Sequence, residues 1–73
     1  MRAIYPRIVV QFGRNLKAAR ISAGLTQSEL AARAGVAFSL ITQIESGVCD
    51  PDLRLIDALA KVVGRTASEL LRC

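Results

Sequence analysis

The chain has 73 residues and a net charge of +4, with a sequence pI near 9.8, so it has room for one domain, residues 1–73, and its charge favours a polyanionic partner. A hydrophobic content of 52% with only 4% aromatic residues, and no alternating strand pattern, predicts an all-α fold. The sequence has no histidine, and its two cysteines, Cys49 and Cys73, lack metal-ligand spacing, so neither a metal site nor a cofactor is expected.

The first predicted helix begins at Pro6, because proline is accepted at the first helical position, where its missing N–H would have no partner. It runs to about Ala23, and Gly24 supplies the left-handed residue that ends it. Residues 1–5 carry no helix cap and are expected to form a mobile arm. No apolar stretch approaches the roughly 20 residues of a membrane span, so no membrane partner is expected. The buried stripe of this helix is Val9, Phe12, Leu16, Ala19 and Ala23, at three- and four-residue steps.

Thr26 begins a second helix, because its hydroxyl can accept a backbone N–H of the first turn and Glu29 can bond back to the N–H of Thr26. Gly35 ends this helix, and Val36 is placed to fill the inside of a tight corner. A third helix then runs from Ala37 to Ser46. Two short helices joined by a glycine-bearing turn make a helix-turn-helix over residues 26–46. Their apolar faces are Leu30, Ala31 and Ala34 in the first and Leu40, Ile41 and Ile44 in the second.

The rest of the chain predicts two more helices. Asp52 is a suitable N-cap for a fourth helix, which ends at Gly64. Thr66 and Glu69 repeat the capping-box spacing and begin a short fifth helix. The fourth helix is expected to bury Leu55, Ile56, Leu59, Ala60 and Val63, and the fifth carries Leu70 and Leu71.

A particular set of residues occupies the ends and inner faces of these predicted helices. It consists of Gly24-Leu25-Thr26-Gln27, Glu29-Leu30-Ala31, Gly35-Val36, Ile41, Ile44-Glu45, Gly47, Pro51, Leu55, Leu59-Ala60 and Gly64. This set resembles the helix-turn-helix proteins of the lambda and Cro repressor family, also called the Xre family, over about residues 12–71. The resemblance implies a compact five-helix lambda-repressor-like domain. It also implies binding of double-stranded DNA by a homodimer on a pseudo-palindromic operator and regulation of transcription, in kind similar to the small stand-alone controllers of restriction-modification systems. In a chain this short, activity is expected to depend on the protein's own concentration, as in autoregulation.

In such proteins the second helix of the pair enters the major groove with its exposed residues on base edges. Gln43 is the sharpest candidate, because its amide both donates and accepts, as recognition of adenine requires. Phe38 can make only an apolar contact, such as one with a thymine methyl. The family usually has a Ser- or Asp-like cap and then Arg, Gln or Lys where this chain has Ala37 and Phe38. The predicted base-facing residues are Phe38, Ser39, Thr42 and Gln43; without the motif, the same residues describe an ordinary solvated helix face.

Other polar residues are assigned to phosphates or to the fold. Gln27 falls in the first turn of the second helix, where free N–H groups and the helix dipole favour an anion, and the resemblance implies a phosphate contact there. Arg20 and Glu45 occupy positions that in the family form a partly buried ion pair; the alternative is an exposed pair of little energetic weight. Further phosphate candidates, which can equally be solvated surface residues, are Arg14, Lys17 and Ser46.

Leu70 and Leu71 are adjacent and lie about 100° apart on a helix, so one neighbour can hardly bury both. One is expected in the core and the other in a homodimer interface, unless both complete the core of one subunit. A different use of the same fold is a protein-interaction module of antitoxin type, which would be indicated if Phe38 and Leu40 formed an exposed apolar patch. The sequence contains no catalytic motif, so we expect no enzyme activity and no small-molecule ligand, and a cytoplasmic protein with reduced cysteines.

Overall fold

The computed structural model describes residues 7–72, and this range consists of helices, turns and loops without a strand. The all-α prediction is therefore confirmed. The helices are α1 (Arg7–Ser22), α2 (Gln27–Ala34), α3 (Phe38–Glu45), α4 (Leu53–Val63) and α5 (Ala67–Leu70). The predicted arm at residues 1–5, together with Pro6 and Cys73, lies outside the described range. None of the helices in this range is long and apolar enough to cross a membrane.

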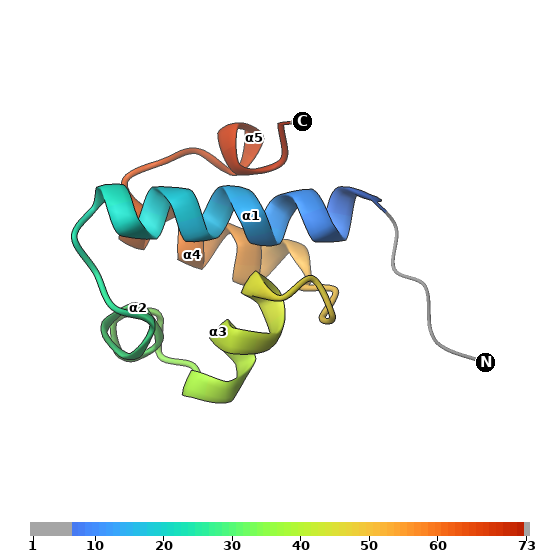
Figure 1. Ribbon diagram of the computed structural model, residues 1–73. Helices are drawn as coiled ribbons and strands as arrows, with labels where there is room; N and C mark the ends of the chain where they lie inside the picture. Colours follow the sequence, from blue (N-terminus) through green and yellow to red (C-terminus); the bar gives the residue numbers. More distant parts are fainter. Residues whose placement is uncertain (1–6, 73) are drawn as a thin grey trace.

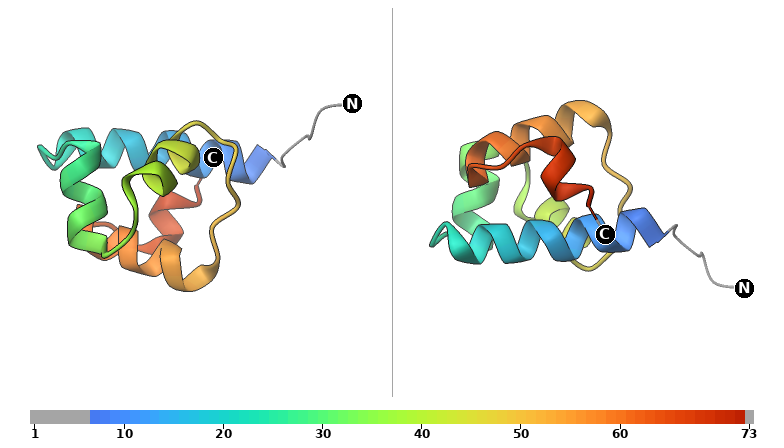
Figure 2. Two further views of the ribbon diagram at one scale, coloured as in Figure 1. Left: turned by 90° about the horizontal axis from the view of Figure 1, so that it is seen from below. Right: turned by 90° about the horizontal axis from the view of Figure 1, so that it is seen from above.

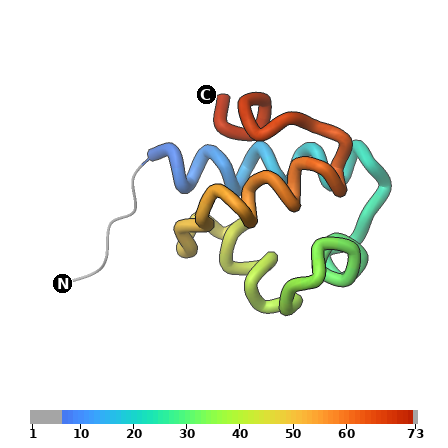
Figure 3. Tube along the Cα trace, turned by 180° about the vertical axis from the view of Figure 1, so that it is seen from behind, coloured from blue at the N-terminus to red at the C-terminus, as the bar shows by residue number. Residues whose placement is uncertain are grey.

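α1 and α4 lie side by side and form the middle of the bundle (Figures 1 and 3). α2 and α3 pack on one side of this pair, and α5 packs on the opposite side (Figure 1). Seen from below, α2 and α3 are the elements nearest the viewer (Figure 2, left). The helix-turn-helix therefore forms one surface of the molecule, and α5 with Leu71 and Arg72 forms the other.

Every helix contributes at least one fully buried side chain to a single core. Ala23, which we predicted to be buried, is exposed, because α1 ends at Ser22 and the chain turns away through Gly24, at φ +75°. Asn15 fastens α5 to α1, since its Nδ2 donates to the carbonyl oxygens of Leu70, at 2.8 Å, and of Arg72. The largest fully buried side chains are Phe12, Leu16, Leu30, Ile41, Ile44, Leu59 and Leu70.

Side chains cap three of the helices, as predicted. The Thr26 hydroxyl accepts the Glu29 N–H, and the Glu29 carboxylate accepts the Thr26 N–H. Thr66 begins α5 with the same reciprocal pair of bonds, and Asp52 caps α4. α3 differs, because Ala37 occupies its N-cap position and makes no side-chain capping hydrogen bond.

Gly13 of α1 allows the end of α3 to approach closely. A Cβ atom at this position would collide with the carbonyl oxygen of Ile44 and would lie 3.3 Å from the Cα atom of Glu45. One helical turn before it lies Val10, whose Cα atom would be only 3.3 Å from a Cβ atom added at Gly47, just beyond the end of α3. The two helices thus meet backbone against backbone, which determines how α3 projects from the bundle.

Candidate nucleic-acid interface

The exposed face of α3 is the first component of the candidate interface. Ile41 and Ile44 are completely buried and anchor the helix to the core. No other element covers the opposite face in the view from below (Figure 2, left). Of the predicted base-facing residues, Phe38, Ser39 and Gln43 are exposed and Thr42 is half-buried. All four lie on the outer side of α3.

The four outer residues differ in what they can offer a base. Thr42 donates its hydroxyl hydrogen to the Ser39 carbonyl oxygen at 2.8 Å. Its side chain therefore has no free donor, although the oxygen can still accept. Among residues 7–72, the only side-chain hydrogen bond on this face is that from Thr42 to the Ser39 carbonyl, so the amide of Gln43 and the hydroxyl of Ser39 have no partner there. These two side chains keep their full hydrogen-bonding capacity for a ligand.

A buried polar cluster holds the helix-turn-helix against α1. Arg20 donates to Glu45 through Nε, at 2.8 Å, and through Nη2, at 3.1 Å. The Glu45 side chain is 3% exposed and that of Arg20 is 11% exposed. Arg20 also donates through Nη1 to the carbonyl oxygen of Leu25, at 2.8 Å. The predicted ion pair is therefore present, bidentate and buried, and it links α1 to the end of α3 and to the loop before α2.

Gln27 is a further member of this cluster that we did not predict. Its Nε2 donates to Glu45 Oε1 at 3.0 Å. The bond uses one N–H of the amide and leaves the second N–H free, beside the first backbone N–H groups of α2, which have no partner within the helix. Gln27 thus binds Glu45 and keeps a donor for an anion, so its predicted phosphate contact remains sterically and chemically open. Only the packing of α2 against α3 could reveal this bond, because the two residues are 18 positions apart.

The other predicted phosphate contacts surround the same surface. Arg14 and Lys17 are exposed on α1, directly after Gly13 and one turn beyond it, and Ser46 is exposed at the end of α3. Because Gly13 packs against the C-terminal end of α3, Arg14 and Lys17 lie near that end of the helix, where Ser46 is exposed. Their contacts with phosphate remain predictions.

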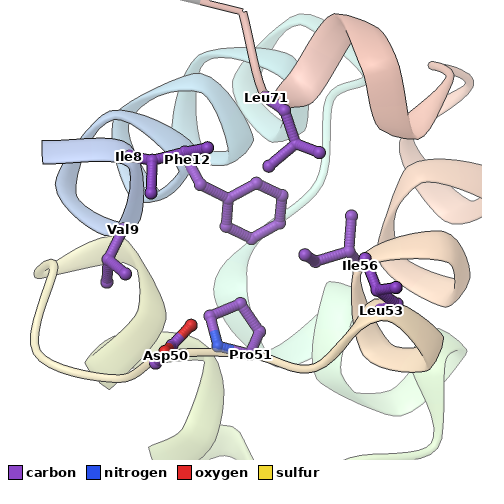
Figure 4. A pocket seen from close by; sticks show the side chains of 8 residues that line it. All are labelled: Ile8, Val9, Phe12, Asp50, Pro51, Leu53, Ile56 and Leu71. Carbon is purple, nitrogen blue, oxygen red and sulfur yellow. The ribbon is translucent and has the colours of Figure 1, made fainter. Parts of the chain in front are cut away.

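A second exposed feature is an apolar groove away from α3. Figure 4 shows its lining: the start of α1, the loop before α4, the start of α4 and the Leu71 side chain all contribute. Leu53 is 78% exposed and Ile8 is 52% exposed. Leu70, one of our two interface candidates, is buried in the core at 2% exposure, so of the two only Leu71 has surface left for a partner. The residues lining the groove are Ile8, Val9, Phe12, Asp50, Pro51, Leu53, Ile56 and Leu71.

Comparisons with known proteins agree with this geometry. The HTH_3 helix-turn-helix family model matches residues 16–70. The restriction-modification controller protein C.AhdI from Aeromonas hydrophila superposes with a TM-score of 0.84 at 31% sequence identity, over 89% of this chain and 98% of that one. SinR, a master regulator for biofilm formation, was solved in complex with DNA and superposes with a TM-score of 0.80 at 31% identity, over 84% of this chain and 98% of that one.

A third structure, the clp gene regulator ClgR from C. glutamicum, shares the fold with a TM-score of 0.86 at 23% identity, over 96% of this chain and 90% of that one. No curated protein sequence matches the chain. The family model covers most of the chain, and its range includes α2, α3 and the turn between them. The protein therefore belongs to the Xre-like helix-turn-helix family of transcription regulators.

Proposed function

We propose that the protein binds double-stranded DNA sequence-specifically, as a homodimer on a pseudo-palindromic operator, and regulates transcription in the cytoplasm, including that of its own gene. The observation that carries the proposal is the exposed outer face of α3, with free donors and acceptors on Ser39 and Gln43, held rigidly by the buried cluster of Arg20, Glu45 and Gln27. A reading surface must be held in one orientation to distinguish bases, and this cluster supplies the constraint.

In the proposed complex α3 lies in the major groove and α2 crosses the phosphate backbone. Gln43 contacts an adenine through both atoms of its amide. Gln27 contacts a phosphate through its free N–H, assisted by the N-terminal dipole of α2. Arg14, Lys17 and Ser46 contact further phosphates and determine position without reading sequence.

The known proteins support this proposal. At 31% identity, one similar structure is a restriction-modification controller and another was solved with DNA bound. A controller of this kind needs no sensor domain if its own concentration determines how much dimer forms. We therefore favour control through dimerisation.

The alternative, a protein-interaction module of antitoxin type, has less support. It calls for an apolar patch formed by Phe38 and Leu40. Phe38 is 52% exposed, but Leu40 is half-buried and packs against the core. Phe38 therefore stands among polar residues on this face, as a DNA-reading surface predicts.

The test compares two glutamine variants on DNA selected from a random pool by the wild-type protein. Gln43→Ala should lose about 1–3 kcal/mol of discrimination at one base pair per half-site. Gln27→Ala should weaken selected and unrelated sequences by the same factor, because a phosphate contact carries no base information. Binding of the wild-type protein should also fall steeply as salt is raised. If Gln43→Ala selected the same sequences as the wild type with equal stringency, the assignment of Gln43 would be wrong.

A further inference from the structure

The exposed face of α3 divides into two parallel stripes of different chemistry. Residues four apart on a helix are neighbours on its surface. Ser39 and Gln43 therefore form one stripe, and both are exposed and polar. Phe38 and Thr42 form the other. The first stripe can read hydrogen-bonding edges, so the question is what the second stripe reads.

The second stripe, Phe38 and Thr42, presents mainly apolar atoms to a DNA groove. The Phe38 side chain is 52% exposed, although Phe12, in the core, is almost completely buried. Thr42 has committed its hydroxyl hydrogen to the Ser39 carbonyl oxygen, which also holds the side chain in one rotamer and leaves the γ-methyl as its other branch. Ala37, which precedes Phe38, adds a small apolar side chain without a capping bond.

Within the part of the chain that the structure describes, this stripe has no evident structural use. Phe38 does not belong to the hydrophobic core, so the fold does not require an aromatic ring at this position. An exposed ring on a surface that faces a ligand points instead to an apolar group in that ligand. In the major groove the apolar group that distinguishes one base from another is the C5-methyl of thymine.

We propose that Phe38 and Thr42 together form a surface that recognises the C5-methyl group of a thymine in each half-site, next to the base read by Gln43. The inference rests on the proposed function, because it concerns the same face of α3. The recognised group is the methyl, which 5-methylcytosine also presents in the major groove. We assign thymine as its source, and the experiment includes both bases.

The experiment replaces each thymine of the selected site by deoxyuridine, which removes only the methyl group. Burying one such group is worth about 0.8 kcal/mol, or about fourfold in affinity. We expect wild-type binding to weaken about fourfold at one thymine per half-site, and much less at the other thymines. Phe38→Ala should bind the thymine and deoxyuridine sites equally.

Variants of Thr42 separate its methyl from its hydroxyl. Thr42→Ser keeps the hydroxyl that bonds to Ser39 and removes the methyl, so the ratio of thymine to deoxyuridine affinity should fall. Thr42→Val keeps a branched apolar side chain, and the ratio should persist. Ser39→Ala, on the polar stripe, is the matched control and should leave the ratio unchanged. Circular dichroism checks that each variant remains helical.

A cytosine pair and a 5-methylcytosine pair at the sensitive position complete the test. If 5-methylcytosine raises the affinity over cytosine by the same factor as thymine over deoxyuridine, the protein recognises the methyl group itself. If 5-methylcytosine does not raise the affinity, the inference is overturned. If the wild-type protein bound the site equally well after every deoxyuridine replacement, the inference would also be overturned. The proposed function would still stand in that case, because the protein would still bind the site specifically. A complete lack of specific DNA binding would overturn both.

Discussion

Gly13 is a residue at which the fold tolerates very little change. An added Cβ would meet the carbonyl oxygen of Ile44 and the Cα atom of Glu45, which are backbone atoms and cannot rotate away. We therefore expect Gly13→Ala to lower the free energy of unfolding by about 1–3 kcal/mol, even though alanine is the better helix former by about 1 kcal/mol. Urea denaturation measures the change. Ser22→Ala, at the exposed end of α1, is the control and should stay within about 0.5 kcal/mol of the wild type; a Gly13 variant as stable as the wild type would contradict the close approach of α1 and α3.

Arg20 and Glu45 should behave as one unit. Their side chains are 11% and 3% exposed, so removing either leaves a buried charge without its partner, at a cost of about 3 kcal/mol or more. In a double-mutant cycle the loss for Arg20→Ala with Glu45→Ala should be clearly smaller than the sum of the single losses. Asp57 and Lys61 form an exposed ion pair, with side chains 58% and 77% exposed, and serve as the control, with losses under about 1 kcal/mol. Additive losses at Arg20 and Glu45 would rule out the coupling.

For single residues, the sequence indicated which side chains have a role better than it indicated the partners of those side chains. The pairing of Arg20 with Glu45 was expected from the resemblance and is confirmed. The bond from Gln27 to Glu45 was missed, because it depends on how two helices cross and leaves no local pattern. The same holds for the bond from Thr42 to Ser39, since a helical threonine can point its hydroxyl toward the backbone or away from it.

The helices α2 and α5 begin with the same pair of reciprocal bonds, and this makes part of their stability depend on pH. The N–H of Thr26 donates to the Glu29 carboxylate at 2.8 Å, and that of Thr66 to Glu69 at 2.9 Å. These backbone hydrogen bonds, reinforced by the threonine side chains, lower the pKa of both carboxyl groups. Each carboxyl group therefore binds its proton less readily in the folded state than in the unfolded chain.

The sign of the pH effect follows from this difference. The stabilisation is complete above the ordinary glutamate pKa of 4.5 and is lost as the pH falls through the lowered value in the folded protein. Glutamine at the same positions can complete the capping box without titrating. We expect the stability difference between the wild type and the Glu29→Gln/Glu69→Gln variant, measured by urea denaturation, to be constant above pH 4.5 and to move against the wild type in more acidic solution. A difference that does not change with pH would exclude this linkage.

Helix ends were the most predictable elements, because their signals are local. The caps at Thr26, Asp52 and Thr66 were each expected from residues within three positions, and all three are confirmed. The end of α1 was placed at Ala23, one residue late, because a stripe of apolar residues does not show where the chain leaves the helix. α3 begins after Ala37 without a side-chain cap, so its start depends on the packing of Ile41 and Ile44.

At the scale of the whole molecule, the apolar groove was not predictable from sequence. Its walls come from the start of α1, from the loop before α4 and the first turn of α4, and from Leu71 (Figure 4). The lining residues of α1 are at least 38 positions from the others in the chain. The sequence indicated only that Leu70 and Leu71 would have different roles. The structure assigns Leu70 to the core, while Asn15 holds the carbonyl groups of Leu70 and Arg72 on either side of Leu71.

We therefore expect the proposed homodimer to use this groove. A second copy placed across a two-fold axis would cover Leu53, Ile8 and Leu71 with the same residues of its own groove, and both recognition helices would then face the DNA about one helical turn apart. Leu53→Glu and Leu71→Glu should each convert a dimer into a helical monomer in sedimentation equilibrium at micromolar concentration. They should also weaken binding to the full palindrome far more than to a single half-site. Ile21→Glu changes an equally apolar residue, 58% exposed, outside the groove, and should remain dimeric. Without a contact between subunits, the second half-site adds nothing to affinity. A wild-type protein that sediments as a monomer and binds one half-site as tightly as two would therefore contradict both the proposed dimer and the proposed two-fold operator.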